Sequence, residues 1–448
     1  MTIKTALMSA SVLLVMSASA QAAITAEQAA KLGTELTPFG ANPNGNAEGT
    51  IPAWTGGLTE APAGYKKGSG DYVDPFADEK PLYVITAANM AQYDQYLTPG
   101  TKALLQRFPD SYKVPVYPSH RTAAFPQNVY EDIKRDAQTV EIVDERTADI
   151  TNVGNGRIPF PIPTTGAQAM TNLAHKYFHD DIVMTYGNFP VQSNGSYTPV
   201  KAQQWRAWAP TMDGTEFGIK VFYEMFAPAS NAGYKIVTHE PLNFAKTPRQ
   251  TWAYNPGQRR VLRAPEISYD TPIAGSDGLV TNDATDCFSG AKDRYDWKLV
   301  GKRELIVPYN NYKLNSLQIK VKDIVGPQHV NPDLMRYELH RAWVVEATLA
   351  EGQRNVFGKR HIYLDEDSWT CLGADMYDNR NELWRVVVVS NMQMYDVPML
   401  MQRLEAHYDL QARRYMVQYA ANEDGPYKFG NGAKPSDFTI AKLRRSGR

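Results

Sequence analysis

Apolar and polar residues alternate in many short runs along the C-terminal part of the chain. In the run 217–226, every second residue from Phe217 to Met225 is apolar, and the residues between them are mixed. Successive side chains of a β-strand point to opposite faces, so this period of two predicts a strand with one apolar face. The same pattern predicts strands at 182–191, 199–208, 234–240, 249–254, 259–264, 296–307, 314–324, 336–349, 359–364, 369–376, 382–391, 403–409 and 412–419.

The connections between these runs are short and rich in turn-forming residues. Asn255-Pro256-Gly257 and Asp378-Asn379-Arg380-Asn381 are two examples. Short turns join antiparallel neighbours, whereas parallel strands need long crossovers. A sheet of this many strands must close, split or curl. We therefore expect an α+β fold, in which helices from the N-terminal half cover a large, curved antiparallel sheet, an incomplete β-barrel.

The region 23–180 has a different pattern, in which helical periods alternate with dense Pro and Gly. Helices are predicted at 25–35, 86–97, 99–107, 126–138 and 166–177. Between the first two, residues 38–82 carry too many Pro and Gly residues for a regular element. This arm is expected to be ordered because it carries the apolar anchors Ile51, Trp54, Leu58, Tyr65 and Phe76. We expect 23–180 to wrap the 181–448 sheet domain in one compact unit.

Residues 1–22 have the order of a secretory signal peptide. Lys4 precedes a short apolar run, and small residues follow, ending in Ala20-Gln21-Ala22. We expect cleavage near Ala22, with a cut after Ala20 as the alternative. An uncleaved anchor would need about 20 apolar residues, more than this run provides. No Cys follows the cleavage site, so a lipid anchor has no attachment point, and no later segment reaches transmembrane length. The sequence predicts a soluble periplasmic protein.

Composition and cysteine count narrow the function classes. Lys plus Arg number 47 against 48 for Asp plus Glu, a net charge of −1, so the basic surface of a nucleic-acid-binding protein is not expected. The two cysteines, Cys287 and Cys371, would enter a compartment where disulfides persist. They form either a disulfide or two separate buried thiols. Neither belongs to a C-x-x-C motif, so the sequence does not support a thiol redox enzyme.

Motifs of enzymes and of metal or phosphate sites are weak. No G-x-S-x-G elbow and no phosphate loop is found. His175 and His179 would share one helix face, a metal-like spacing, although a solvated helix end explains them as well. The acidic positions Asp277, Asn282, Asp283, Asp286, Asp293 and Asp296 match no calcium loop. The basic tail Lys442, Arg444, Arg445 and Arg448 either contacts anionic lipid or a partner, or serves solubility. We predict no catalytic residue, no metal and no cofactor.

Aromatic residues on both faces of the predicted strands indicate either a packed core or a hydrophobic cavity between the sheet and the helices. If one face looks inward to a ligand, the more continuously apolar registers are the candidates. These are Ile219, Val221, Tyr223, Met225, Trp252, Tyr254, Trp343, Val345 and Leu349.

Four long strings carry a resemblance to a known family. They are NAEGTIPAWTGG (46–57), DRYDWKLVGKRELIVPYNNY (293–312), RYELHRAWVVEATL (336–349) and KRHIYLDEDSW (359–369). The chain resembles, over almost its whole mature length, the exported family numbered 1329 among the domains of unknown function. This resemblance implies a fold similar to the lipoprotein carriers LolA and LolB. It also implies as partners an RND-superfamily transporter and an outer-membrane protein. The family has no established catalytic residues, and this chain departs from LolB in lacking a lipidation Cys.

The leading hypothesis is a periplasmic carrier or chaperone for a hydrophobic or lipid-like molecule, working with an RND-type envelope transporter. A non-catalytic envelope assembly or adaptor protein is the first alternative. An enzyme acting on apolar substrates is the second.

Overall fold

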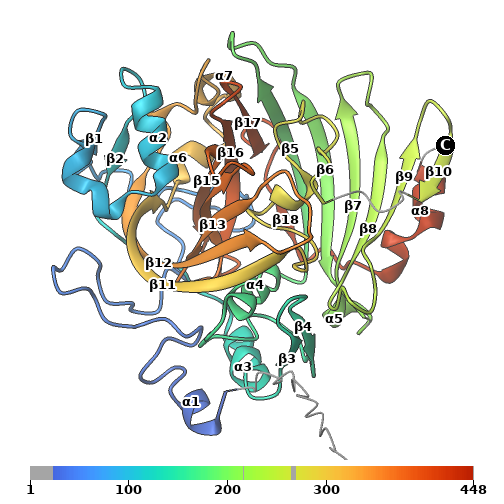
Figure 1. The fold of residues 1–448 in the computed structure, drawn as a ribbon, viewed down its shortest axis with the longest axis horizontal. Helices are drawn as coiled ribbons and strands as arrows, with labels where there is room; N and C mark the ends of the chain where they lie inside the picture. The colour runs from blue at the N-terminus through green and yellow to red at the C-terminus, as the bar shows by residue number, and fades with distance from the viewer. Residues whose placement is uncertain (1–23, 215, 264–268, 447–448) are drawn as a thin grey trace, which may run out of the picture.

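The computed structural model describes residues 24–214, 216–263 and 269–446, so the predicted signal peptide lies outside the described residues. A single sheet of sixteen strands dominates the fold (Figure 1). The strand order is β1-β2-β12-β13-β14-β15-β16-β17-β5-β6-β7-β8-β9-β10, with β11 on the free side of β12 and β18 beside β5. The strand pairs are antiparallel, apart from one parallel contact between β2 and the start of β12. In the described chain β10 and β11 each pair with one neighbour, so the sheet is not closed into a barrel.

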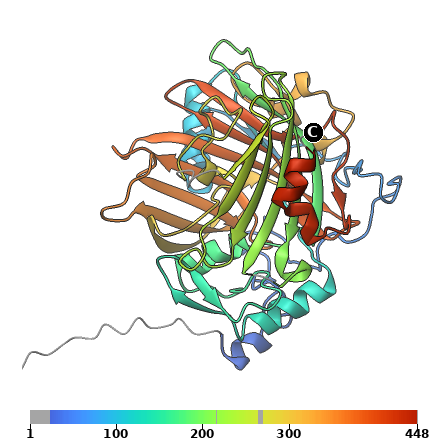
Figure 2. The ribbon, with the colours of Figure 1, turned by 90° about the vertical axis from the view of Figure 1, so that its right-hand side faces the viewer.

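The strands fall into two sets. The central set is β11 (Tyr295–Pro308), β12 (Tyr337–Leu349), β13 (Lys359–Asp365), β14 (Cys371–Tyr377), β15 (Leu383–Met394), β16 (Met399–Asp409) and β17 (Arg414–Ala420). The other set, which we call the wing, is β5 (Asp181–Val191), β6 (Val200–Trp208), β7 (Phe217–Ala227), β8 (Lys235–Pro241), β9 (Gln250–Asn255) and β10 (Arg260–Arg263). The two sets run at an angle to each other, as expected for a strongly twisted and curved sheet (Figure 2).

Shorter strands and the helices complete the fold. The short strands are β1 (Tyr83–Ile85), β2 (Val114–Val116), β18 (Lys428–Phe429) and the separate pair β3 (Glu141–Asp144) and β4 (Asp149–Thr151). The α-helices are α1 (Ala26–Ala30), α2 (Pro99–Arg107), α3 (Gln127–Asp136), α4 (Gly166–Ala174), α5 (Ala209–Met212), α6 (Tyr312–Asn315), α7 (Val321–Ile324) and α8 (Ile440–Ser446). The 3₁₀ helices are η1 (Met90–Tyr96), η2 (Asn282–Ala284), η3 (Pro332–Leu334) and η4 (Pro435–Phe438).

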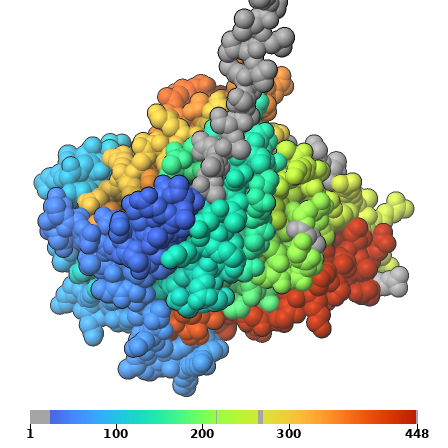
Figure 3. All heavy atoms as spheres, turned by 90° about the horizontal axis from the view of Figure 1, so that it is seen from below, coloured from blue at the N-terminus to red at the C-terminus, as the bar shows by residue number. Residues whose placement is uncertain are grey.

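Both faces of the central strands are buried. On one face, α3, α4, the arm and the segment 279–295 pack against β12–β16 in a single apolar cluster that includes Phe39, Ile133, Met170, Val345 and Met392. On the other face, α2, β1, β2 and the segment 314–335 form a second cluster. Viewed from below, the N-terminal residues (blue) and the α3–α4 region (teal) adjoin on the surface (Figure 3). The helices of the N-terminal half therefore cover the curved sheet, as the sequence predicted.

The arm is ordered by its apolar anchors. Ile51 is 1% exposed and joins the second cluster, and the remaining four predicted anchors pack against the first cluster. Trp54 also donates a hydrogen bond from Nε1 to the carbonyl of Ala123, at 2.9 Å. Without regular secondary structure, the arm is held by single side chains inserted between elements of the core.

Most predicted strands are confirmed, and the differences have physical causes. The strand predicted at 314–324 is wrong, because the segment forms α6 and α7 with an irregular link between them. The helix predicted at 86–97 is the 3₁₀ helix η1. The periodic pattern does not reveal β1–β4, which have three or four residues each, too few to show a period. It also missed α8, which was interpreted only as a basic tail.

Cys287 and Cys371 form a disulfide, with their Cα atoms 6.3 Å apart, so the first of the two expected alternatives is confirmed. The bond links the segment before β11 to the start of β14.

No helix in the described ranges is both long and apolar enough for a membrane crossing.

Candidate functional site

A cavity of about 80 Å³ lies between the C-terminal end of α4, the lower part of the wing and the segment 286–292. Its apolar lining comes from Met170, Leu173, Phe178, Trp208, Ile219, Leu242, Phe244 and Phe288. Its ionisable lining comes from His175, Lys176, Arg206, Glu240, Asp286 and Lys292. Apolar walls with a few polar groups pointing into the cavity are typical of small-molecule binding sites.

Strand register places one wall of this cavity. Trp208 on β6 lies opposite Ile219 on β7, which lies opposite Glu240 on β8. Directly paired residues share a face of the sheet, so these three side chains point to the same side. We call this side the inner face of the wing, and it continues along β7 through Val221 and Tyr223.

The remaining walls come from α4 and from the disulfide-linked loop. Thr165 caps the N-terminus of α4 by accepting a hydrogen bond from the backbone N–H of Gln168. Helix α4 brings Met170 and Leu173 to the cavity. Asp286 and Cys287 both have a positive φ, 53° and 64°, an uncommon conformation for residues other than glycine. The disulfide at Cys287 holds this turn next to the cavity.

Asp286 is the centre of a buried charge group. Its Oδ2 lies 3.2 Å from Nη1 of Arg206 and 3.8 Å from Nζ of Lys176. Burial would raise the pKa of Asp286, but the two cations outweigh burial and lower it. Burial lowers the pKa of Lys176. One carboxylate thus faces two cations in this part of the cavity.

Glu240 and Lys292 are the other two charged residues of the lining. Glu240 forms an ion pair with Arg249, and its Oε2 is buried without a hydrogen-bond partner in the described chain. Lys292 is 5% exposed, and burial lowers its pKa to about 8. Within the described ranges no carboxylate lies within 4.0 Å of its Nζ. The lining therefore carries more positive than negative charge.

The structure separates the nine predicted ligand-binding residues. Ile219 lines the cavity, and Val221, Tyr223 and Met225 share its face. The expectation of one common inward face is wrong for the next pair, because Trp252 and Tyr254 lie on the opposite, outer face. There they pack with Val237 and with Leu443 of α8. The last three belong to the packed cluster beneath α4: Trp343, Val345 and Leu349. Ligand binding by these residues stays a prediction.

His175 and His179 do not form the shared helix face that their spacing predicted. Helix α4 ends at Ala174, and His179 lies beyond it with a φ of 70°. His175 is buried, and its Nδ1 lies 2.8 Å from the carbonyl oxygen of Gly156. Burial lowers the pKa of His175 to about 3, so the ring is neutral at physiological pH. The alternative of a solvated helix end is equally wrong for His175.

The acidic positions and the basic tail also have separate environments. Asp283 is buried against Arg360, whereas Asp277 accepts a hydrogen bond from Gln192. In the tail, Lys442 of α8 forms an ion pair with Asp437. Arg444 and Arg445 are exposed near the end of the same helix, and Arg448 lies outside the described residues.

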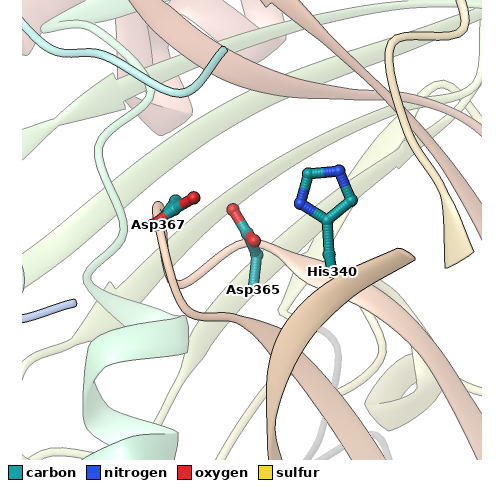
Figure 4. A group of neighbouring side chains, drawn as sticks. All are labelled: His340, Asp365 and Asp367. Carbon is teal, nitrogen blue, oxygen red and sulfur yellow. The ribbon is translucent and has the colours of Figure 1, made fainter. Parts of the chain in front are cut away.

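A second group of ionisable side chains lies deep in the central sheet. His340 on β12, Asp365 at the end of β13 and Asp367 in the following turn lie close together (Figure 4). Each offers a potential metal-ligand atom, and these atoms lie within 4.8 Å of one another. Burial and the charge of Asp367 raise the pKa of Asp365 to about 7. Its Oδ1 is buried without a hydrogen-bond partner in the described chain.

Existing partners already satisfy much of this group. Arg121 donates two hydrogen bonds to Asp367, at 2.7 and 2.8 Å. His340 contacts Glu338 through Nε2, at 2.9 Å, and stacks on Tyr309. A guanidinium therefore occupies the side of Asp367 that a cation would need. We interpret the group as a buried polar network of the sheet.

Sequence reasoning missed both of these groups, with one partial signal. The short connection 350–358 predicts that 336–349 and 359–364 pair as a hairpin, and the hairpin aligns Ala342 with Asp365. His340 is two residues from Ala342 and on the same face of the sheet. The hairpin pattern alone therefore places His340 next to Asp365. Lys292 lies in a loop without any period, and nothing in its local sequence marks it as part of a cavity.

Comparison with known proteins places the chain in a family. A protein of Pseudomonas aeruginosa described as uncharacterized is 44% identical over 433 residues, which cover 95% of this chain and 94% of the relative. Residues 84–444 match the family described as "Protein of unknown function (DUF1329)".

Three solved structures are similar at low identity. A Vibrio parahaemolyticus domain proposed to sort outer membrane lipoproteins is 14% identical, with a TM-score of 0.45, covering 62% of this chain and 98% of that domain. A DUF1329 family protein from Desulfovibrio piger is also 14% identical, with a TM-score of 0.43, covering 62% and 97%. A LolA superfamily protein from Nitrosomonas europaea is 12% identical, with a TM-score of 0.38, covering 62% and 100%. These scores lie below 0.5, so the description of the fold and the site rests on this chain's own structure. On the strength of the sequence match over 361 residues and the 44% identical relative, this chain belongs to the DUF1329 family.

Proposed function

We propose that this protein is an exported periplasmic carrier that binds one hydrophobic molecule at the inner face of the wing. The observation that carries the proposal is the cavity beside Ile219, on a face of the wing that also bears the half-buried apolar residues Val221, Tyr223 and Ile236. Contiguous apolar surface that a protein leaves open commonly marks a binding site. The function is transfer of a bound molecule, with no bond made or broken.

The volume of the cavity limits how the ligand binds. Sites that enclose a whole ligand have volumes of about 300 to 1,000 Å³, whereas this cavity has about 80 Å³. We infer that the cavity holds one end of the ligand and that the chain lies along the inner face. Sheltering about 300 Å² of acyl surface would contribute about 7 kcal/mol at roughly 25 cal/mol per Å². Two cavities against the central strands are smaller, about 10 and 20 Å³, and apolar clusters pack on both faces of these strands.

The family resemblance supports a further proposal about partners. We infer that the carrier receives its ligand from, or delivers it to, an RND-superfamily transporter and an outer-membrane protein. Cross-linking in cells, followed by purification of the carrier, should recover the transporter. Recovery of neither partner would contradict this part of the proposal alone.

Native mass spectrometry tests the carrier function. The chain, expressed with residues 1–22, is purified from the periplasmic fraction without detergent, and bound molecules are identified after organic extraction. We expect one apolar molecule per chain in the wild type and a loss of at least half of it in Val221→Asp. That substitution places a charge on the inner face.

Phe226→Asp is the matched control, because Phe226 lies on the same strand, on the outer face, and is 48% exposed. This variant should keep its ligand. A wild-type chain that consistently carries no ligand would refute the proposal, as would equal loss in the two variants.

A further inference from the structure

The cavity holds a buried cation without a carboxylate partner. Lys292 lines the cavity, and the residue is 5% exposed to solvent. Taking an ammonium group out of water without a counter-charge is costly, and proteins usually pair such groups. No hydrogen bond or ion pair of Nζ is present among the described residues. The charge of Lys292 thus lacks the compensation that the other cations of the cavity have.

The nearby acids are engaged elsewhere. Asp286 lies between Arg206 and Lys176, and Glu240 pairs with Arg249. The electrostatic influence of Asp149 also reaches Lys292. Its carboxylate, however, accepts hydrogen bonds from the backbone N–H groups of Phe244 and Ala245, at 2.9 and 3.1 Å. The charges of Asp149 and Glu240 both act on Lys292, but within the described ranges neither carboxylate lies within 4.0 Å of its Nζ.

We infer that the ligand of the wing is an anionic amphiphile whose charged head group enters the cavity and binds Lys292. This inference rests on the proposed carrier function. A water molecule in the liquid takes up about 30 Å³, so a cavity of this size accommodates a carboxylate and its first methylene groups. Ile219, Val221 and Tyr223 then lie in line on the inner face, where an alkyl chain would continue.

Charge preference among ligands of equal chain length tests the inference. Isothermal titration calorimetry is performed with decanoate, 1-decanol and decyltrimethylammonium, each below its micelle concentration. We expect the wild type to bind decanoate about tenfold more tightly than decanol, since a hydrogen bond to a charged group is worth roughly one factor of ten or more. The cationic probe should bind most weakly.

Variants of Lys292 identify the group responsible. Lys292→Met should weaken decanoate binding about tenfold and leave decanol binding unchanged, whereas Lys292→Arg should keep the preference. Lys298→Met is the matched control, because it removes the same charge from an exposed position on β11. It should behave as the wild type.

The outcomes separate the inference from the carrier function. If decanoate and decanol bind the wild type equally, the inference fails and the carrier function stands. The same conclusion follows if Lys298→Met loses as much affinity for decanoate as Lys292→Met. If none of the three probes binds the wild type, the carrier function itself is contradicted, and the inference falls with it. The wild-type comparison needs no variant, so poor folding of Lys292→Met would not decide the matter.

Discussion

Removing the Cys287–Cys371 disulfide is expected to destabilise the whole protein and to loosen the cavity. The two cysteines are 84 residues apart, and both side chains are fully buried. In the loop-entropy model, a cross-link of this span lowers the entropy of the unfolded chain enough to stabilise the fold by about 4 to 5 kcal/mol. The double variant Cys287→Ala/Cys371→Ala should lose most of that free energy of unfolding, measured by urea denaturation.

The local effect is specific to this structure. The bond fixes the segment that supplies Asp286, Phe288 and Lys292 to the cavity. In the double variant, hydrogen–deuterium exchange should rise in peptides covering 284–292 and stay unchanged in β15 and β16. Folded wild-type protein in which the Cys287–Cys371 disulfide has been reduced should show the same loss of stability and the same rise in exchange. A loss below about 1 kcal/mol, far under the loop-entropy value, together with unchanged exchange at 284–292, would refute this reasoning.

Three further predictions concern buried charge and processing. Arg360→Met should destabilise the fold by about 3 to 5 kcal/mol, because it leaves the carboxylate of Asp283 buried and unpaired. Arg380→Met, which removes an exposed arginine, should leave the urea midpoint unchanged. Burial raises the pKa of Asp365 to about 7 in the folded state, whereas in the unfolded state the carboxyl loses its proton near pH 4. Between these two pH values the folded state therefore binds one more proton than the unfolded state. The contribution of Asp365 to stability therefore declines as the pH rises from about 4 to about 7, and Asp365→Asn should gain stability relative to wild type between pH 5 and pH 8, measured by thermal melts. Amino-terminal sequencing of periplasmic protein should find a mature chain that begins directly after Ala22; retention of the first residues would contradict export by cleavage.

The sequence was most informative where periodicity reports burial directly. In the first half of β11, from Tyr295 to Val300, buried or half-buried residues alternate with exposed ones, so this strand follows from the local pattern. The other central strands bury both faces, and there a short apolar run bounded by turns is the signal. The segment 314–324 misled for a related reason. Leu314, Val321 and Ile324 are all buried, but they are buried by two single helical turns that a short apolar run cannot distinguish from a strand.

The site was harder to predict because it depends on contacts between distant segments. Trp252 and Val221 look equally suitable in sequence, and only the pairing of β7, β8 and β9 shows that they face opposite ways. The burial of Trp252 depends on Leu443 in α8, almost two hundred residues later. The charge group around Asp286 likewise joins Lys176, just after α4, with Arg206 on β6 and a loop that a disulfide holds in place.

Two of the edge strands, β10 and β11, show how an open sheet of this size can avoid aggregation. Backbone groups along an unpaired rim invite pairing with another molecule, and natural proteins counter this with charge, brevity and irregular strands. The four residues of β10 include Arg260 and Arg263, both solvent-exposed. In β11 the register shifts between Leu299 and Gly301, in a stretch that also bears exposed Lys298 and Arg303. Positive charge and irregular pairing at these two edges disfavour the addition of a strand from a second molecule. Under the proposed carrier function, the apolar inner face of the wing can therefore stay accessible without aggregation.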